Sequence, residues 1–154
     1  MKMDQIAYLC RDENERMKLK TMFGLDRAKW IEDKVTAKSE VMGCPSAINV
    51  AKLEFNYDLG VELEILTYVE GPNWHDINPL AASNFGTFLS HIGIHLGDNE
   101  AFPEVPHWML VQETWTQSHT APLLVENGRK YHYKIYMVTP GTYVKYIKRI
   151  HKEA

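Results

Sequence analysis

Four polar side chains of different chemistry stand at matching places in the two halves of the chain. Gln5 lies near the start of an apolar run, and His91 lies in a similar run 86 positions later. Glu64 belongs to the alternating segment that closes the first half, and Lys145 belongs to the corresponding segment 81 positions later. Such a near-constant offset indicates an internal duplication. A duplication would place the amide, carboxylate, imidazole and ammonium groups around one shared cleft, where they could bind a small molecule.

The first half has the pattern of a strand, a helix and three further strands. Asp12 followed by Glu15 is a capping-box arrangement, an apolar side follows, and Gly24 is a stop signal. A helix is therefore predicted from about 13 to 23. Alternating and apolar runs bounded by turn residues predict strands at 4–10, 29–42, 46–57 and 61–68.

The second half repeats this order with a weaker helix. Pro103 and Pro106 interrupt the segment where the helix should lie, so only a short helix at about 104–111 is predicted. The predicted strands are 90–96, 113–119, 129–138 and 142–150. We expect one domain over 1–154, with module one at about 1–70, a crossover at about 71–87 rich in Gly, Pro, Asn and Ser, and module two at about 88–151.

Composition excludes several classes of protein. A chain of 154 residues can bury a sizeable core, and 45% hydrophobic with 24% charged residues is neither disordered nor fibrous. The formal charge of −3 argues against a nucleic-acid partner, because such binding needs a clustered cationic face. No apolar run reaches the length of a membrane span and no basic, apolar leader precedes the first strand, so we expect a cytoplasmic protein with free thiols and no membrane partner.

Four segments, in order and covering nearly the whole chain, carry a resemblance to a known family. They are Gln5-Ile6-Ala7-Tyr8, Val61-Glu62-Leu63-Glu64-Ile65-Leu66, Ser90-His91-Ile92-Gly93-Ile94 and Tyr136-Met137-Val138-Thr139-Pro140-Gly141. At these spacings they resemble the vicinal oxygen chelate superfamily, which includes glyoxalase I, bleomycin-resistance proteins, fosfomycin-resistance enzymes and extradiol dioxygenases. The resemblance implies an α+β fold of two βαβββ modules that form a curved mixed sheet around one cleft. It also implies a homodimer, since small members commonly pair.

The resemblance further implies a set of metal ligands, one of which is missing. In metal-using members the ligands come from equivalent positions of four strands, and Gln5, Glu64 and His91 fall on the first three. Lys145 falls on the fourth, which is normally a Glu. An ammonium group cannot coordinate a divalent cation. We therefore expect no cofactor, with Fe, Zn, Ni or Mn as the candidates if a metal does bind, and a buried ion pair between Glu64 and Lys145 is an alternative use of the position.

Neighbouring residues leave alternatives open. Glu62 lies two residues from Glu64 on the same face of its strand, so either carboxylate could face the cleft. His95 returns to the face of His91 and could complete a site of two histidines and one carboxylate, or could be structural. Tyr136 could line the cleft or belong to the core, and Trp74 in the crossover could form part of a lid.

Two classes of function follow from these residues. The first is a protein that binds or sequesters a small organic ligand in a cleft without a complete metal site, as in the bleomycin-resistance branch. The alternative is a metal-dependent lyase, isomerase or dioxygenase that acts on a small substrate with adjacent oxygens. Lys145 favours the first class, whether the protein is an enzyme stays open, and metal analysis of the purified protein would distinguish the two.

Overall fold

A computed structural model of the chain describes residues 1–41, 44–70, 88–117 and 130–150. In the first half, β1 (Lys2–Leu9) is followed by α1 (Glu13–Met22), β2 (Ile31–Val41), β3 (Cys44–Asn56) and β4 (Glu62–Glu70). The second half contains β5 (Phe88–His95), β6 (Met109–Gln117), β7 (Lys130–Thr139) and β8 (Thr142–Ile150). The predicted crossover at 71–87, which includes Trp74, lies outside the described residues.

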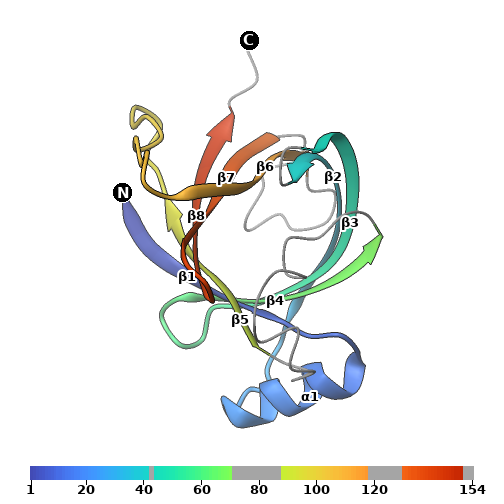
Figure 1. Cartoon of the computed structure of the whole chain (residues 1–154). Helices are drawn as coiled ribbons and strands as arrows, with labels where there is room; N and C mark the ends of the chain where they lie inside the picture. The colour runs from blue at the N-terminus through green and yellow to red at the C-terminus, as the bar shows by residue number, and fades with distance from the viewer. Residues whose placement is uncertain (42–43, 71–87, 118–129, 151–154) are drawn as a thin grey trace.

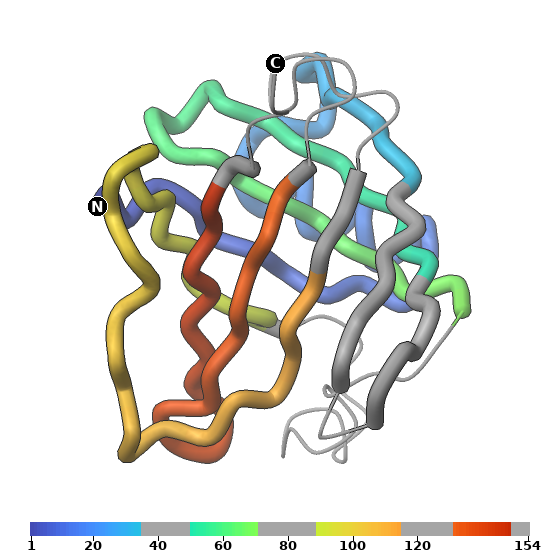
Figure 2. The backbone as a smooth tube through the Cα atoms, turned by 90° about the horizontal axis from the view of Figure 1, so that it is seen from above, coloured from blue at the N-terminus to red at the C-terminus, as the bar shows by residue number. Residues whose placement is uncertain are grey.

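The eight described strands form one closed, mixed sheet (Figure 1). Its order is β1-β4-β3-β2-β6-β7-β8-β5, and β5 pairs with β1 to complete the circle. The pairs β1·β4 and β5·β8 are parallel and the other pairs are antiparallel. The predicted curved mixed sheet is therefore present, and it curls far enough to close. Figure 2 shows β7 and β8 crossing in front of β1 and β4, so that two walls enclose an interior.

Helix α1 covers the outside of the first half. Asp12 caps it by accepting a hydrogen bond from the Glu15 backbone N–H at 2.9 Å, as the capping signal predicts. Gly24, just beyond its end, adopts a φ of 69° that favours glycine. Under the helix, Leu19 packs against Cys10 and Ile65. Because side chains alternate along a strand, the neighbours of Ile65, including Glu64 and Leu66, face the interior instead.

The interior carries most of the apolar core. One cluster joins the first-half residues Ala7, Leu9 and Leu66. A second joins the second-half residues Val111, Ile135 and Tyr143. The interior is therefore apolar at these two places and polar between β1, β4 and β5, where the predicted site residues lie.

The short helix predicted at 104–111 does not form. Residues 97–108 contain no helix, and β6 begins at Met109. Pro103 and Pro106 each lack a backbone N–H, which disfavours a continuous helical ladder there. Phe102 and Trp108 from this segment instead contact the outer aromatic rings of β7, so the segment covers the second half where α1 covers the first. None of the described residues forms a helix with the length and apolar character needed to cross a membrane.

Candidate functional site

Three neighbouring strands bring the predicted polar residues together. β1 lies between β4 and β5, and Gln5 is paired with Glu62 on one side and with Gly93 on the other. One step further along the same face, Ala7 is paired with Glu64 and with His91. Paired residues share a face of the sheet. The amide, both carboxylates and the imidazole therefore project into the same part of the barrel interior.

The Gln5 amide joins these side chains into one hydrogen-bonded cluster. Its Nε2 atom donates to Glu62 Oε1 at 2.6 Å and to Glu64 Oε2 at 2.8 Å. Its Oε1 atom lies 3.0 Å from His91 Nε2. Only the NH₂ group can face two carboxylates, so Oε1 must face the histidine. An amide oxygen only accepts, and His91 Nε2 therefore carries a proton and donates it to Gln5.

Two residues that the sequence reasoning missed extend the cluster. Ser90 Oγ lies 2.9 Å from His91 Nδ1, the nitrogen that faces away from Gln5. The Tyr57 hydroxyl donates to Glu62 Oε2 at 3.2 Å. Ser90 could have been found because it precedes His91 directly. The contact of Tyr57 could not be predicted from the sequence, because it depends on the conformation of the turn that connects β3 to β4.

Burial makes the electrostatics of the cluster unusual. Gln5, Glu64 and His91 are each 3% exposed or less. Loss of hydration raises the pKa of Glu64, with the nearby Glu62 carboxylate adding to the rise and Lys145 opposing it. Burial, and then Glu62, also raise the pKa of Tyr57, so the phenol stays a donor at neutral pH. Both effects favour neutral groups around a buried carboxylate pair.

Lys145 reaches the same region from β8 but does not form the predicted ion pair. It is paired with Gly93, the residue that also faces Gln5. Its Nζ atom lies 4.2 Å from the ring centroid of Tyr133, which is a cation–π distance. Between the described side chains Glu64 and Lys145 no hydrogen bond or ion pair is formed, although the two charges remain close enough to influence each other.

The remaining predicted residues lie apart from the cluster. His95 shares the inner face of β5 with His91, but its ring Nδ1 atom contacts the Asp4 carboxylate near the barrel end. The His95 side chain is about one-third exposed. Tyr136 lies on the face of β7 opposite to the buried Ile135 and contacts Tyr146 and Trp108. Tyr136 therefore belongs to the outer aromatic layer. Trp74 cannot be placed, because it lies outside the described residues.

The side chains of the cluster are of types that bind transition metals, but their atoms are not oriented around a common metal position. An imidazole nitrogen, a carboxylate and an amide oxygen are ligands of Zn, Fe, Ni and Mn. In this structure the Gln5 NH₂ group lies between the carboxylates, and His91 Nε2 carries a proton. Within the part of the chain that the structure describes, no three His, Cys, Asp or Glu side chains gather as a metal-binding group. The expected absence of a cofactor stays a prediction.

Comparisons with known proteins give little. No family model and no curated protein matches the chain. Among solved structures, a variant of methylmalonyl-CoA epimerase from Streptomyces coelicolor, in complex with 2-nitronate-propionyl-CoA, is 11% identical. The alignment covers 96% of each chain with a TM-score of 0.39. A likeness of this size decides neither the fold nor the function of the present chain.

Proposed function

We propose that this protein binds a small organic ligand in the barrel interior, at the cluster of Gln5, Glu62, Glu64 and His91. The observation that carries the proposal is that three buried side chains, those of Glu62, Glu64 and His91, converge on the amide of the buried Gln5. Buried polar groups cost stability unless they are satisfied, so a closed polar cluster inside an apolar barrel is typical of a functional site. Ser90 and Tyr57 hold its two ends.

The strand order supports membership of the vicinal oxygen chelate superfamily. Around the barrel, the strand order of the first half is β1-β4-β3-β2 and that of the second half is β6-β7-β8-β5. Read backwards, the second order is β5-β8-β7-β6, which matches the first strand by strand. Each half begins with the strand that carries Gln5 or His91, and each ends with a parallel neighbour that carries Glu64 or Lys145. Two copies of one strand–crossover–three-strand module, related by duplication, account for this arrangement.

The surroundings of the cluster indicate a ligand with a polar group on an apolar or planar body. Lys145 supplies a cation, Gln5 and His91 supply hydrogen-bonding groups, and Glu62 and Glu64 supply acceptors. Tyr68 and Tyr133 are partly buried, and Tyr133 lies under the Lys145 ammonium group. Loss of hydration raises the pKa of both phenols, and the Glu64 carboxylate adds to the rise. Aromatic walls with a few convergent polar groups are the usual composition of small-molecule sites.

Ligand-observed NMR with a library of small aromatic and carbonyl compounds tests the proposal. Compounds that bind the parent should lose affinity about tenfold or more in Glu64→Gln, because a buried polar contact to a ligand contributes more than 1 kcal/mol. The matched control is Glu104→Gln, which makes the same change at an exposed position. Binding that is lost equally in both variants, or in neither, would contradict a site at the cluster.

Metal analysis of the purified protein decides between this proposal and the metal-dependent alternative. We expect less than stoichiometric metal, because Lys145 occupies the fourth position. One zinc, nickel, manganese or iron per chain, lost in His91→Ala, would favour an enzyme of the glyoxalase or dioxygenase type. Pairing into homodimers is a separate prediction of the resemblance, and sedimentation velocity would test it.

A further inference from the structure

Gly93 occupies the centre of the candidate site without contributing a side chain to it. In β5 it lies between Gln5 of β1 and Lys145 of β8, and it shares their inner face. A Cβ atom built on Gly93 would lie 2.3 Å from Gln5 Oε1, 2.8 Å from Gln5 Cδ and 2.6 Å from Gln5 Cβ. Real Cβ atoms essentially never approach other heavy atoms below 3.0 Å. The Gln5 side chain therefore lies in the space that any other residue at this position would fill.

The close approach has a cause in the backbone. The pairing of β1 with β5 shifts register between Met3 and Gln5, with Asp4 as the extra residue. A bulge of this kind bends the strand and increases its twist, and glycine inside a strand often marks a bulge or a place where another chain segment approaches closely. Gly93 does not have a left-handed φ, since the described glycines with positive φ are Gly24, Gly60 and Gly141. The requirement for glycine is therefore steric and comes from Gln5.

We propose that Gly93 is a positioning residue of the candidate site, because its missing side chain lets Gln5 lie flat across β5. From that position the amide reaches Glu62, Glu64 and His91 at once. A rotamer change of Gln5 could move Oε1 and Cδ away from a new Cβ, but Gln5 Cβ is fixed by its own backbone. A side chain at position 93 must therefore move β1 against β5 or expel the amide from the cluster. The functional meaning of this role rests on the proposed function, whereas the steric role does not.

Gly97 provides a matched control, since it is a second glycine with an ordinary φ close to the end of β5. The three heavy atoms nearest to a Cβ there all belong to the flexible side chain of Glu100, with Oε1 at 3.1 Å. Gly97→Ala should therefore leave the site unchanged. Where the backbone conformation suits both residues and no steric conflict arises, replacing Gly by Ala reduces the freedom of the unfolded chain and is neutral or stabilising.

The test is ¹⁵N NMR of the Gln5 side-chain amide in Gly93→Ala and Gly97→Ala. In the parent and in Gly97→Ala we expect one NH₂ pair displaced from solvent-exposed positions and slow to exchange, because both protons donate to buried carboxylates. The Gln5→Gly variant lacks the pair and assigns it. In Gly93→Ala the displaced pair should disappear, and the urea midpoint should fall. A folded Gly93→Ala protein that keeps the displaced amide pair would overturn the proposal.

A second variant keeps the test decisive if Gly93→Ala does not fold. The double variant Gln5→Gly/Gly93→Ala removes the three heavy atoms that lie nearest to the new Cβ. Its urea midpoint should equal that of Gln5→Gly alone, so that the cost of Gly93→Ala vanishes in this background. A double variant that remains as damaged as Gly93→Ala would show that glycine is needed for a reason other than Gln5. Neither measurement uses a ligand, so failure to find a ligand would leave both outcomes readable.

Discussion

Glu62 and Glu64 share one neutral donor, and this is the most demanding feature of the cluster. Both carboxylates accept from Gln5 Nε2, but Glu62 has a second donor in Tyr57. Among the described residues, Gln5 is the one side-chain donor to Glu64. Because the buried Glu64 is poorly solvated, its protonated form persists to a higher pH than that of an ordinary glutamate. The two carboxylates therefore differ in environment although they are adjacent on the same face.

The raised pKa of Glu64 predicts how stability depends on pH. Above the ordinary value of 4.5 the folded protein holds a proton that the unfolded chain has lost, so the free energy of unfolding decreases as pH rises through the raised pKa. Glu64→Gln should remove this decrease, because the amide keeps the acceptor and carries no charge. The variant should gain about 1.4 kcal/mol over the parent for each unit by which the pKa is raised.

Urea unfolding between pH 4 and pH 8 measures this gain. The difference between Glu64→Gln and the parent should be smallest at the acidic end and reach a plateau at the alkaline end. Glu104→Gln, at an exposed position, should follow the parent throughout. A Glu64→Gln protein that is less stable than the parent at pH 8 would mean that the ionised carboxylate is stabilised in the cluster.

We expect Lys145 to decide whether the cluster can bind a metal. Lys145→Glu should place a third carboxylate opposite Gly93, where the resembled family has its fourth ligand, and should create affinity for nickel or zinc that the parent lacks. Titration calorimetry measures this affinity. Lys18→Glu makes the same charge change at an exposed position of α1 and should bind no metal. Negligible binding by Lys145→Glu as well would show that position 145 is not equivalent to the fourth ligand.

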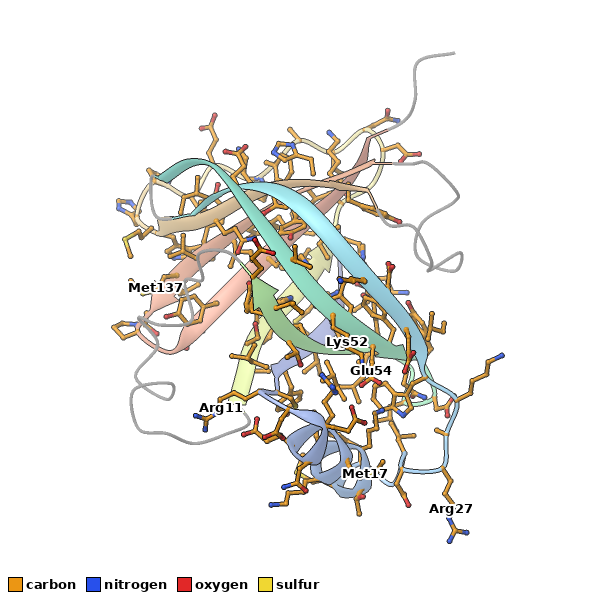
Figure 3. All side chains as sticks on the ribbon, turned by 90° about the vertical axis from the view of Figure 1, so that its right-hand side faces the viewer. Arg11, Met17, Arg27, Lys52, Glu54 and Met137 are labelled. Carbon is orange, nitrogen blue, oxygen red and sulfur yellow. The ribbon has the colours of Figure 1, made fainter. Side chains whose placement is uncertain are left out.

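At the scale of elements, α1 is attached to the sheet by charge as well as by apolar contacts. Glu54 of β3 is buried beneath the helix, 3.1 Å from Lys20 Nζ and 3.7 Å from Arg16 Nε. Arg16 also donates to Thr67 Oγ1 at 2.7 Å, which links the helix to β4. Figure 3 shows Glu54 on the sheet near the helix and Met17 on α1, where Met17 is exposed to solvent. Glu54 is therefore the buried carboxylate that the two cations share, and Glu13 adds an exposed partner for Arg16.

Removal of that carboxylate should be costly. Glu54→Met leaves Arg16 and Lys20 buried without their shared partner, and we expect a loss of about 3 kcal/mol in the free energy of unfolding. Glu13→Gln, which removes an exposed partner of Arg16, should cost less than about 1 kcal/mol. Urea unfolding of both variants measures the difference. Equal, small losses would show that water reaches the two cations.

The elements show which parts of the fold local sequence can predict. Asp12, Glu15 and Gly24 predicted α1 correctly, because caps and stop signals act within one turn. Glu54 was missed, because alternation along a strand tells which residues share a face but not that a helix covers the polar face. The same limit applies to Tyr136, which local pattern could not separate from inward-facing aromatics. Gln5, Glu64 and His91 were expected to lie together because the inferred duplication relates distant strands, and Glu62 was an alternative to Glu64 because the two share a strand face.

At the scale of the whole molecule, the two halves close on each other along two seams. One seam is β1·β5, which carries the polar cluster, and the other is β2·β6. The sequence predicted a curved sheet but not the β2·β6 seam, because pairing between distant strands depends on how the whole sheet twists. A separated half would expose unpaired backbone groups on both of its edge strands. It would also leave Gln5, Glu62 and Glu64 without His91 and without the second wall of the barrel.

The barrel should therefore unfold in one step, and two tryptophans can report on it. Trp30 packs near Leu19 beneath α1 in the first half, and Trp108 packs near Tyr136 in the second. In each of two variants, one of these tryptophans is kept and the other three are replaced by Phe. For each variant, the urea midpoint measured by fluorescence should equal the midpoint measured by circular dichroism. The two variants should also have equal slopes, because both report loss of the same cooperative unit. A fluorescence midpoint that departs from circular dichroism in either variant would show that one half unfolds first and that the seams do not hold the halves together.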